Sequence, residues 1–422
     1  MERSDRNCLT IPNPSLVVLV GVSGSGKSSF ARKHFLPTEV VSSDFCRGLV
    51  SDDENSQEAT TDAFDVLHYI AGKRLKRGLL TVIDATSVQR EARAPLVRLA
   101  REHHAIPVAI VLNIPERICR ERNALRPDRN FGPHVTRRQS EALRRSLRFL
   151  QKEGFRYVYL LNSPEAIDAA VIERQPLWVD RRTDHGPFDI VGDLHGCLTE
   201  TLDLLDALGY SVEIGVAEDG GRRFSVNHPQ GRRAIFLGDL TDRGPDSPGC
   251  LRLVMDMVAD STAFCMPGNH DDKLLRRLKG RNVRVNHGLD LTLQQLEGEP
   301  PGFSDRVAAF VDGLVSHYVL DDGRLVVAHA GLIESYQGRA SRTVRDFALY
   351  GDVTGETDDD GLPIRGNWPA EYRGSATVVY GHTAVAEPEW LNNTIDIDTG
   401  CVFGGRLTAL RYPERELISV PA

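Results

Sequence analysis

The stretch LVVLVGVSGSGKSSF, residues 16–30, joins an apolar, β-prone run to a Gly/Ser-rich turn and then to a segment with helical spacing. It contains the pattern Gly-x-x-x-x-Gly-Lys-Ser, from Gly21 to Ser28. Glycines let the backbone N–H groups of such a loop curl around phosphate oxygens, at a helix N-terminus whose dipole favours anions. The stretch therefore predicts a strand, a phosphate-binding loop and a helix, with a bound nucleoside triphosphate.

The loop, a P-loop by this pattern, predicts a role for each polar side chain. Lys27 is expected to bridge the β- and γ-phosphates, and Ser28 to hold Mg²⁺. The nucleotide is expected to be ATP, or another nucleoside triphosphate, bound with Mg²⁺. The predicted nucleotide-binding residues of the loop are Gly21, Ser23, Gly24, Ser25, Gly26, Lys27, Ser28 and Ser29.

Strand and helix patterns alternate after the loop. TEVVSSD is predicted as a second strand that ends at Asp44, LLTVIDAT as a third and IPVAIVLNI as a fourth. This alternation predicts a parallel sheet covered by helices. It breaks at QPLWVDRRTDHGP, and a new strand, FDIVGDLHG, follows. We therefore predict a first domain over residues 1–174, a linker over 175–187 and a second domain over 188–422.

A carboxylate at the tip of the second strand is well placed beside the P-loop. Asp44 is predicted to be a general base that accepts a proton from an attacking hydroxyl. Arg47 is expected to clamp a phosphate of the acceptor. The alternative for Asp44 is a helix N-cap. Asp84, at the end of the third strand, is expected either to support Mg²⁺ or to cap the next helix.

Arginine is concentrated in the rest of the first domain. Between Arg90 and Arg148 there are fourteen arginines, no lysine and six acidic residues, which suits bidentate phosphate contacts, the alternative being a solvated helix face. CRERNALRPDR is expected to form a lid over the nucleotide. Arg122 and Arg126 share a helix face and are predicted to neutralise charge during phosphoryl transfer, and Arg129 to contact the nucleotide.

The P-loop, the run SSDFCRGLVSDDENSQEAT, the triplet DAT and the arginine lid resemble the 5'-hydroxyl polynucleotide kinases of the bacterial and phage end-healing type. The run SSDFCRGLVSDDEN is more specific than the P-loop itself. The resemblance implies that Asp44 activates a 5'-OH group and that Arg47 binds the 3'-phosphate of the terminal nucleotide.

The second half carries five elements after short apolar runs: GDLHG, GDLTDRG, GNHDD, VVAHAG and YGHT. Loops at the ends of several strands converge, so these elements are expected to build one site. Their carboxylate, imidazole and amide groups suit divalent metals, and the Asp239 carboxylate is able to bridge two ions. Two ions clamp a phosphate ester and generate a hydroxide. We expect two metals, Mn²⁺ first, with Ni²⁺, Fe²⁺ and Zn²⁺ as alternatives.

The five elements resemble the binuclear metallophosphoesterase (calcineurin-like) superfamily. The resemblance implies a general acid at His270, a phosphate-holding Arg243, and two ligand sets. These sets are Asp193, His195 and Asp239 for one metal, and Asp239, Asn269, His329 and His382 for the other. The chain has Gly-His-Thr where many members have Gly-His-x-His. Asp398, in IDIDTGCVFGG, is expected to orient a ligand or to complete the site, and this run also resembles diadenosine tetraphosphatases and protein serine/threonine phosphatases.

The predicted fold class is α/β, with a P-loop parallel-sheet kinase domain followed by a metallophosphoesterase α/β sandwich. Joined in this order, the halves resemble bacterial polynucleotide kinase-phosphatase. The resemblance implies phosphorylation of 5'-OH ends of RNA or DNA and removal of 3'-phosphate or 2',3'-cyclic phosphate in RNA repair. It implies strand ends as substrates, and a ligase and an RNA 3'-terminal methyltransferase as partners. The Lys-x-Asp-Gly motif of the family's C-terminal ligase domain does not follow.

Two other functions stay open. One is a small-molecule kinase fused to a dinucleoside-polyphosphate hydrolase, which the run DTGCVFGG favours. The other is a nucleotide-dependent switch that controls the phosphatase, a scheme in which Asp44 and Arg47 have no clear role.

The bulk composition indicates a cytoplasmic protein. The net charge is -8, and no run of about 18 apolar residues predicts a membrane span. The N-terminal residues are polar, so export is not expected. None of the seven cysteines forms a Cys-x-x-Cys pair, so neither a disulfide framework nor a zinc ribbon is indicated. The oligomeric state stays open, with a homodimer as one alternative.

Overall fold

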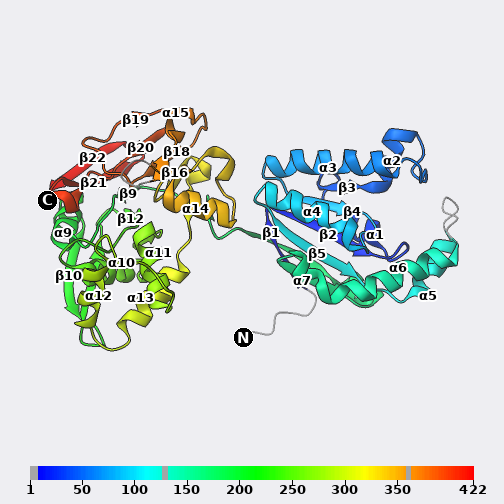
Figure 1. The fold of residues 1–422 in the computed structure, drawn as a ribbon, viewed down its shortest axis with the longest axis horizontal. Coiled ribbons are helices and arrows are strands. Elements are labelled where there is room, and N and C mark those ends of the chain that lie inside the picture. Colours follow the sequence, from blue (N-terminus) through cyan, green and yellow to red (C-terminus); the bar gives the residue numbers. More distant parts are fainter. Residues whose placement is uncertain (1–7, 126–131, 358–362) are drawn as a thin grey trace. The chain divides into compact units, whose positions relative to one another are not determined.

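The computed structural model of the chain describes residues 8–125, 132–357 and 363–422. These residues form two compact units (Figure 1). Unit 1 comprises Met1–Leu177 with Arg339–Ser341, and unit 2 comprises Trp178–Gly338 with Arg342–Ala422. The division between Leu177 and Trp178 falls within residues 175–187, which the sequence predicts as a linker.

Unit 1 is built on a five-stranded parallel sheet of order β3-β4-β2-β5-β6. Its strands are β2 (Ser15–Gly21), β3 (Val40–Ser42), β4 (Thr81–Asp84), β5 (Ile106–Leu112) and β6 (Tyr157–Leu161). Strand β2 is central and buried along its whole length, as its run of apolar residues predicts. The chain moves to one side of β2 for β3 and β4 and to the other side for β5 and β6. The P-loop therefore leaves the sheet at the point where the strand order reverses, which is where open α/β sheets bind ligands.

Helices connect the strands of unit 1 (Figure 1). They are α1 (Lys27–His34), α2 (Ser43–Ser51), α3 (Thr60–Lys76), α4 (Arg90–Glu102), α5 (Glu116–Ala124), α6 (Pro133–Ser146), α7 (Leu150–Glu153) and α8 (Pro164–Ala169). A separate parallel pair, β1 (Cys8–Asn13) with β7 (Val171–Pro176), was not predicted from the sequence.

Unit 2 contains two larger sheets. One has the order β13-β12-β9-β21-β22 and the other the order β19-β20-β18-β15-β14-β8. Phe188 and Ile235 of the first sheet and Val327 and Val379 of the second belong to one buried cluster, so the sheets form a sandwich. The strands are β8 (Asp180–Arg181), β9 (Phe188–Val191), β12 (Arg233–Phe236), β13 (Ala263–Cys265), β14 (His317–Leu320), β15 (Leu325–Ala328), β18 (Thr377–Tyr380), β19 (Trp390–Leu391), β20 (Thr394–Asp396), β21 (Arg406–Tyr412) and β22 (Glu416–Pro421).

Helices pack on the outside of this sandwich and give it the predicted α/β character. A second cluster joins the first sheet to helices, for example Val191 and Phe236 to Leu204 and Leu253. A third joins Val326 and Val378 of the other sheet to further helices. The helices are α9 (Leu198–Leu208), α10 (Ser247–Ala259), α11 (Asn269–Leu278), α12 (Leu289–Glu297), α13 (Phe303–Gly313), α14 (Arg342–Tyr350) and α15 (Trp368–Glu371). Two antiparallel pairs complete the unit: β10 (Ser211–Val216) with β11 (Arg222–Asn227), and β16 (Val353–Thr357) with β17 (Pro363–Arg365).

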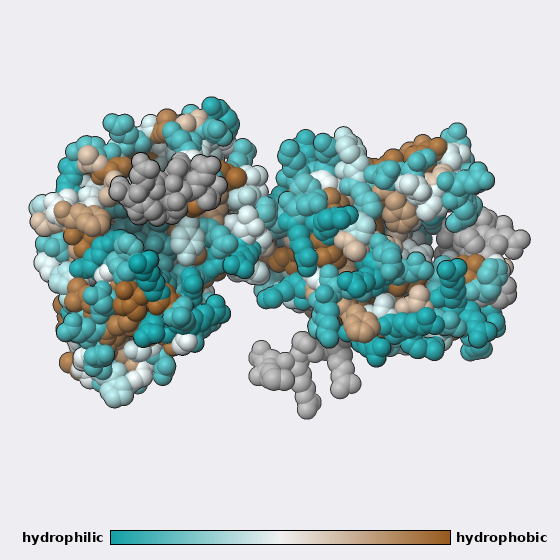
Figure 2. Space-filling view, viewed as in Figure 1, coloured by the Kyte–Doolittle hydropathy of each residue, from teal (hydrophilic) through white to brown (hydrophobic). Residues whose placement is uncertain are grey.

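The surface is mainly hydrophilic on the face shown in Figure 2. Among residues 8–125, 132–357 and 363–422, no helix is long and apolar enough to cross a membrane. Both findings agree with the absence of a long apolar run in the sequence.

One ion pair is buried inside unit 1. Arg93 of α4 donates to Glu153 of α7 through Nε and Nη2, at 2.8 and 2.7 Å, and to the Ser87 carbonyl at 2.9 Å. The side chain of Arg93 is 0% exposed and that of Glu153 is 6% exposed. Removing one partner leaves an uncompensated buried charge, which costs about 3–5 kcal/mol.

We expect Arg93→Ala to destabilise unit 1 by that amount without affecting unit 2. All three tryptophans, Trp178, Trp368 and Trp390, lie in unit 2, so tryptophan fluorescence reports unit 2 while circular dichroism reports both units. The urea transition followed by circular dichroism should split and begin earlier, while the fluorescence transition stays in place. Arg98→Ala, at an exposed position of the same helix, is the control. Coincident, unshifted transitions in the Arg93 variant would contradict the expectation.

Candidate functional sites

The P-loop connects β2 to α1 through two glycines in the left-handed region. Gly24 has φ 84° and Gly26 has φ 100°. A Cβ atom at Gly24 would overlap the Cys119 carbonyl and lie 2.9 Å from Asn123 Oδ1. Both backbone angle and close packing therefore require glycine at position 24.

Lys27 lies inside the curve of this loop. Its Nζ donates to the carbonyl oxygens of Gly21, at 2.8 Å, and Val22, at 3.1 Å. The side chain is buried, so its ammonium group is held at the concave side of the loop. This is where the sequence predicts that phosphate binds.

Two residues that the sequence analysis did not assign hold the loop from outside. Asn123 Nδ2 donates to the Ser23 carbonyl at 3.0 Å, and Ser23 Oγ donates to Asn123 Oδ1 at 3.4 Å. The Ser23 N–H donates to Gln139 Oε1 at 2.9 Å. Asn123 lies within the run CRERNALRPDR, but only the arginines of that run carried a signal in the sequence.

A small cavity of about 30 Å³ borders the P-loop. Its lining brings the predicted base Asp44 together with Lys27 and Ser28 of the loop and with Asp84 at the tip of β4. Arg47 lies directly beside it, because its Nη1 donates to Asp44 Oδ1 at 2.7 Å and to the Glu54 carbonyl at 3.1 Å. A carboxylate and the P-loop lysine thus line one pocket, and a guanidinium pairs with that carboxylate.

The structure corrects the expected backbone around Asp44. Strand β3 ends at Ser42, and Asp44 lies in the first turn of α2 rather than at a strand end. The N-cap of α2 is Ser42, whose Oγ accepts from the Phe45 N–H at 3.4 Å, so the alternative of Asp44 as N-cap is wrong. The N-cap of α4 is Gln89, which likewise leaves Asp84 without a capping role.

A second, wider cavity, of about 350 Å³, also borders the P-loop glycines. Arg122 lines it together with Gly24, Gly26, Ser29 and Lys33. Loop N–H groups and two cations are suited to bind a polyphosphate. The other predicted arginines, Arg126 and Arg129, lie outside the described residues.

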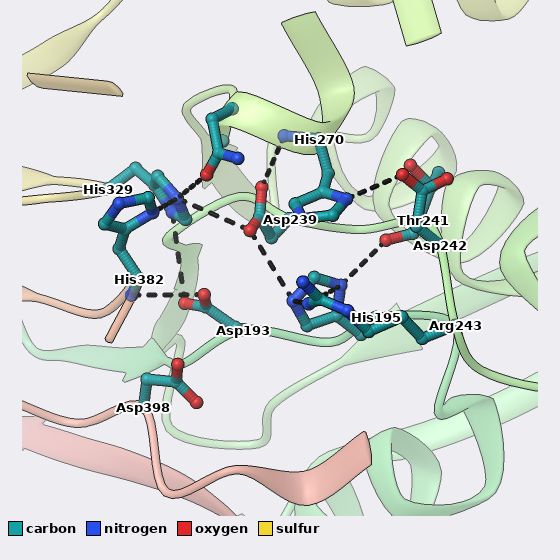
Figure 3. A network of polar contacts seen from close by, with 12 residues as sticks. Asp193, His195, Asp239, Thr241, Asp242, Arg243, His270, His329, His382 and Asp398 are labelled. Carbon is teal, nitrogen blue, oxygen red and sulfur yellow. Dashed lines mark hydrogen bonds and ion pairs between the residues drawn. The ribbon is translucent and has the colours of Figure 1, made fainter. Parts of the chain in front are cut away.

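In unit 2 the predicted ligands follow six strands of the two sheets. Asp193 and His195 follow β9, Asp239 follows β12, and Asn269 and His270 begin α11 after β13. His329, His382 and Asp398 follow β15, β18 and β20. Figure 3 shows that the labelled histidines His195, His270, His329 and His382 lie around Asp239, with Asp398 at one side next to Asp193.

Asp239 is shared by two groups of candidate ligands. Its Oδ2 lies 3.5 Å from His195 Nε2 and 3.5 Å from His329 Nε2. Ligand atoms within 4.8 Å of one another form two clusters, His195 with Asp239 and His270, and Asp239 with His329 and His382. Burial would raise the pKa of Asp239, but the surrounding histidines, His329 first, lower it below its usual value.

Two of the histidines are held in the tautomer that binds metals. His195 Nδ1 donates to the Thr241 carbonyl at 2.9 Å, and His329 Nδ1 to the Leu237 carbonyl at 3.0 Å. These bonds turn each Nε2 toward Asp239. Burial also lowers the pKa of His195 to about 4, which keeps the imidazole neutral, as a metal ligand must be.

The remaining donors also fit a metal centre. Asp193 Oδ2 accepts from the His382 N–H at 3.1 Å, while Asp193 Oδ1 is buried with no hydrogen-bond partner among the described residues. Burial, and then Asp398 and Asp239, raise the pKa of Asp193 well above its usual value. A buried oxygen atom without a donor, among like charges, is what a cation would stabilise. Asn269 Oδ1 lies 3.1 Å from His329 Nε2, within the second cluster.

His270 belongs to the first cluster, and Arg243 contacts that cluster through His195. His270 Nδ1 lies 2.6 Å from Asp242 Oδ2, and Thr292 Oγ1 donates to Asp242 Oδ1 at 2.7 Å. Burial lowers the pKa of His270, but Asp239 and the bond to Asp242 outweigh burial and raise it. Arg243 Nη1 donates to His195 Nε2 at 2.6 Å. The supporting roles of Asp242 and Thr292 were not predicted, and Thr292 lies outside every motif.

The backbone of this centre is strained at several ligands. Non-glycine residues in the left-handed region cost about 1–3 kcal/mol each and concentrate at functional sites. The residues of this centre with such angles are His195 (φ 43°), Asp239 (φ 46°), Asp242 (φ 76°), Arg243 (φ 71°) and His382 (φ 79°).

We expect Asp239→Asn to abolish the binding of both metals, because the carboxylate lies in both clusters. Calorimetric titration of the chelator-treated chain with Mn²⁺ should show that the affinity of both sites falls by at least roughly 10–100-fold, or that neither site is detected. Asp203→Asn, at an exposed position of α9 in the same unit, is the control. Retention of one full-affinity site in the Asp239 variant would contradict a shared carboxylate, provided that its thermal unfolding matches the control.

Comparison with known proteins agrees with the two sites. Residues 16–150 match the AAA domain family, and residues 186–408, more than half of the chain, match the calcineurin-like phosphoesterase family. Unit 2 is similar to proteins named bis(5'-nucleosyl)-tetraphosphatase PrpE [asymmetrical]. The protein from Anoxybacillus flavithermus is 47% identical over 239 residues, which are 56% of this chain and 94% of that protein.

Further relatives show the same coverage. The Geobacillus sp. protein of the same name is 46% identical over 238 residues, 56% of this chain and 94% of its own length. The one from Bacillus thuringiensis is 45% identical over 240 residues, with the same two shares. The fold class predicted from the sequence is thereby confirmed, and the family implies divalent metals in unit 2, as the P-loop implies a nucleotide with Mg²⁺ in unit 1. The chain is an enzyme with a P-loop kinase-like domain and a metal-dependent phosphoesterase domain, and it belongs to the calcineurin-like phosphoesterase family.

Proposed function

We propose that the chain heals the broken ends of nucleic acid strands. Unit 1 transfers the γ-phosphate of ATP to a 5'-OH end, and unit 2 removes a 3'-phosphate or a 2',3'-cyclic phosphate. A kinase and a phosphatase that act on the same group would cancel, whereas on opposite ends they prepare a break for ligation. The observation that carries the proposal is that Asp44, which lines one pocket with Lys27 and Ser28, is paired with Arg47.

The kinase pocket supplies a base, an acceptor clamp and charge neutralisation. Asp44 accepts the proton of the attacking hydroxyl, and Arg47 leaves Asp44 to hold the phosphate of the terminal nucleotide. Lys27 binds the transferred group, and Arg122 and Arg126 neutralise its charge. Ser28 would hold Mg²⁺, which would supply further neutralisation of the phosphates.

The phosphatase centre divides its work between metals and side chains. Asp193, His195 and Asp239 would hold one divalent metal, and Asp239, Asn269, His329 and His382 the other, with Mn²⁺ the expected ion. Such metals would polarise the phosphate ester and lower the pKa of water. Arg243 holds a phosphate oxygen. His270 gives its proton to the leaving oxygen, and Asp242 with Thr292 fixes the ring that carries this proton.

The ends produced define the partners. A 5'-phosphate and a 3'-OH are the substrates of a ligase, so a ligase acts next on the product. An RNA 3'-terminal methyltransferase is the other partner that we propose. RNA or DNA strand ends are the expected substrates, and the reaction fits a cytoplasmic setting.

Asp44→Ala should abolish the kinase and spare the phosphatase. With ATP, Mg²⁺ and a 5'-OH RNA oligonucleotide, transfer of label should fall by about 10²–10⁴-fold, the usual contribution of a general base. Release of phosphate from a 3'-phosphorylated oligonucleotide should not change. Asp62→Ala, an exposed aspartate of α3, is the control. Loss of both activities would contradict the assignment of the two reactions to separate sites, and absence of transfer by the unaltered chain would refute the kinase reaction.

A second candidate function rests on the relatives of unit 2. Their printed name describes a bis(5'-nucleosyl)-tetraphosphatase. Unit 2 would then hydrolyse a dinucleoside polyphosphate, and unit 1 would phosphorylate a small molecule. The metal centre serves either reaction, because both break a phosphoester or phosphoanhydride bond at a clamped phosphate.

The two candidates differ in the preferred substrate of unit 2. With Mn²⁺ and equal concentrations, we expect a higher kcat/KM for a 3'-phosphorylated RNA oligonucleotide than for diadenosine tetraphosphate. His270→Ala should lower both rates, which verifies that one centre performs both reactions. A clear preference for diadenosine tetraphosphate, together with no transfer of phosphate to RNA, would replace end healing by the second candidate.

A further inference from the structure

Three cysteines belong to the core of unit 2, and one of them, Cys197, donates through Sγ to the His195 carbonyl at 3.9 Å. Cys197 is the N-cap residue of α9, Cys250 lies in the first turn of α10, and Cys401 begins the short 3-10 turn Cys401–Phe403. They are 5%, 0% and 3% exposed and belong to one buried cluster. The thiols of Cys197 and Cys401 share a hydrogen bond.

A carboxylate oxygen of the half-buried Glu200 lies beside two of these thiols. Glu200 lies three residues after Cys197, on the same turn of α9. A carboxylate oxygen of Glu200 and the Sγ atoms of Cys197 and Cys401 all lie within 4.8 Å of one another. Glu200 Oε2 is buried and has no hydrogen-bond partner among the described residues. A buried carboxylate oxygen without a partner is costly, and thiols, as weak donors, do little to offset that cost.

We propose that Cys197, Glu200 and Cys401 bind a thiophilic divalent cation of the Zn²⁺ class. Two thiolates and one carboxylate are ligands that Zn²⁺ takes in proteins, and sulfur ligands select it over Mg²⁺ or Mn²⁺. A cation would neutralise the carboxylate and both thiolates together. The site differs in chemistry from the histidine–aspartate centre, whose donors are nitrogen and oxygen.

The position of this cysteine–glutamate site indicates its role. Cys197 follows the predicted ligand His195 by two residues, and Cys401 follows Asp398 by three. The cation would therefore tie the loop after β9 to the loop after β20. Both loops carry residues of the phosphatase centre, so the bound ion would have a structural role and hold these two loops together.

Cobalt spectroscopy separates this site from the other metal centre. Co²⁺ bound to thiolate gives an intense charge-transfer absorption in the near ultraviolet, which nitrogen and oxygen ligands do not give. We expect the chelator-treated, reduced full-length chain to develop this band on titration with Co²⁺. Cys197→Ser and Cys401→Ser should each lose at least half of its intensity, and the double variant all of it. Glu200→Gln, which keeps both thiols, should weaken Co²⁺ binding at this band at least tenfold.

The controls make every outcome informative. Cys265→Ser removes another buried thiol of the same unit, on β13, and should keep the band. Asp239→Asn should also keep it, whatever it does to the phosphatase, so the result does not depend on the proposed function. A band that is absent from the unaltered chain, or that survives in the double variant, overturns the proposal. So does a thiol titration of the unfolded, unreduced chain that finds two fewer than the seven cysteines and restores them with reductant, because the pair would then be a disulfide.

Discussion

The candidate functional side chains of both units lie just beyond the ends of buried strands. Every residue of β2 is buried and none is charged, and the one charged residue of the buried strand β9, Asp189, is paired with Arg232 at 2.9 Å. Parallel neighbours end on the same edge, so residues that follow them are brought together. In unit 2 the parallel strands β13, β12 and β9 deliver Asn269, Asp239 and Asp193 to one edge. Strands β15, β18 and β20, also parallel, deliver His329, His382 and Asp398.

This geometry also explains why Asp239 is the shared carboxylate. Strand β12 lies between β13 and β9, so Asp239, which follows it, is flanked by the groups that follow both neighbours. Behind it, burial, followed by the charge of Asp239, raises the pKa of Asp271 to about 8. The protein thus keeps Asp239 ionised among its histidines while the next carboxyl resists ionisation. Asp271 still accepts the N–H groups of Leu240 and Gly268, at 3.0 and 2.9 Å, and so holds together the two loops around Asp239.

The sequence was sufficient for the fold class and for most residues that the two pockets bring together. Glycines, the P-loop lysine and five spaced motifs keep their meaning because each depends on local backbone geometry. The supporting residues were beyond its reach. No motif marks the supporting residues Asn123, Gln139 and Thr292. They lie on helices and contact loops that are distant in the sequence. Ser42, Ser43 and Asp44 are all acceptable caps, so only the backbone shows that Ser42 is the cap. The cysteine–glutamate cluster combines residues from near the beginning and the end of the sequence of unit 2, so no local spacing predicts it.

The left-handed backbone at the phosphatase centre has a consequence for how this enzyme balances durability against activity. At His195, Asp239 and His382 the main chain adopts angles that glycine would accept without penalty. Glycine at these positions would remove the metal ligands and yet relieve the backbone strain. The centre is therefore a place where conformational stability has been given up for reactivity, and variants selected only for thermal robustness would drift toward inactive loops at these positions.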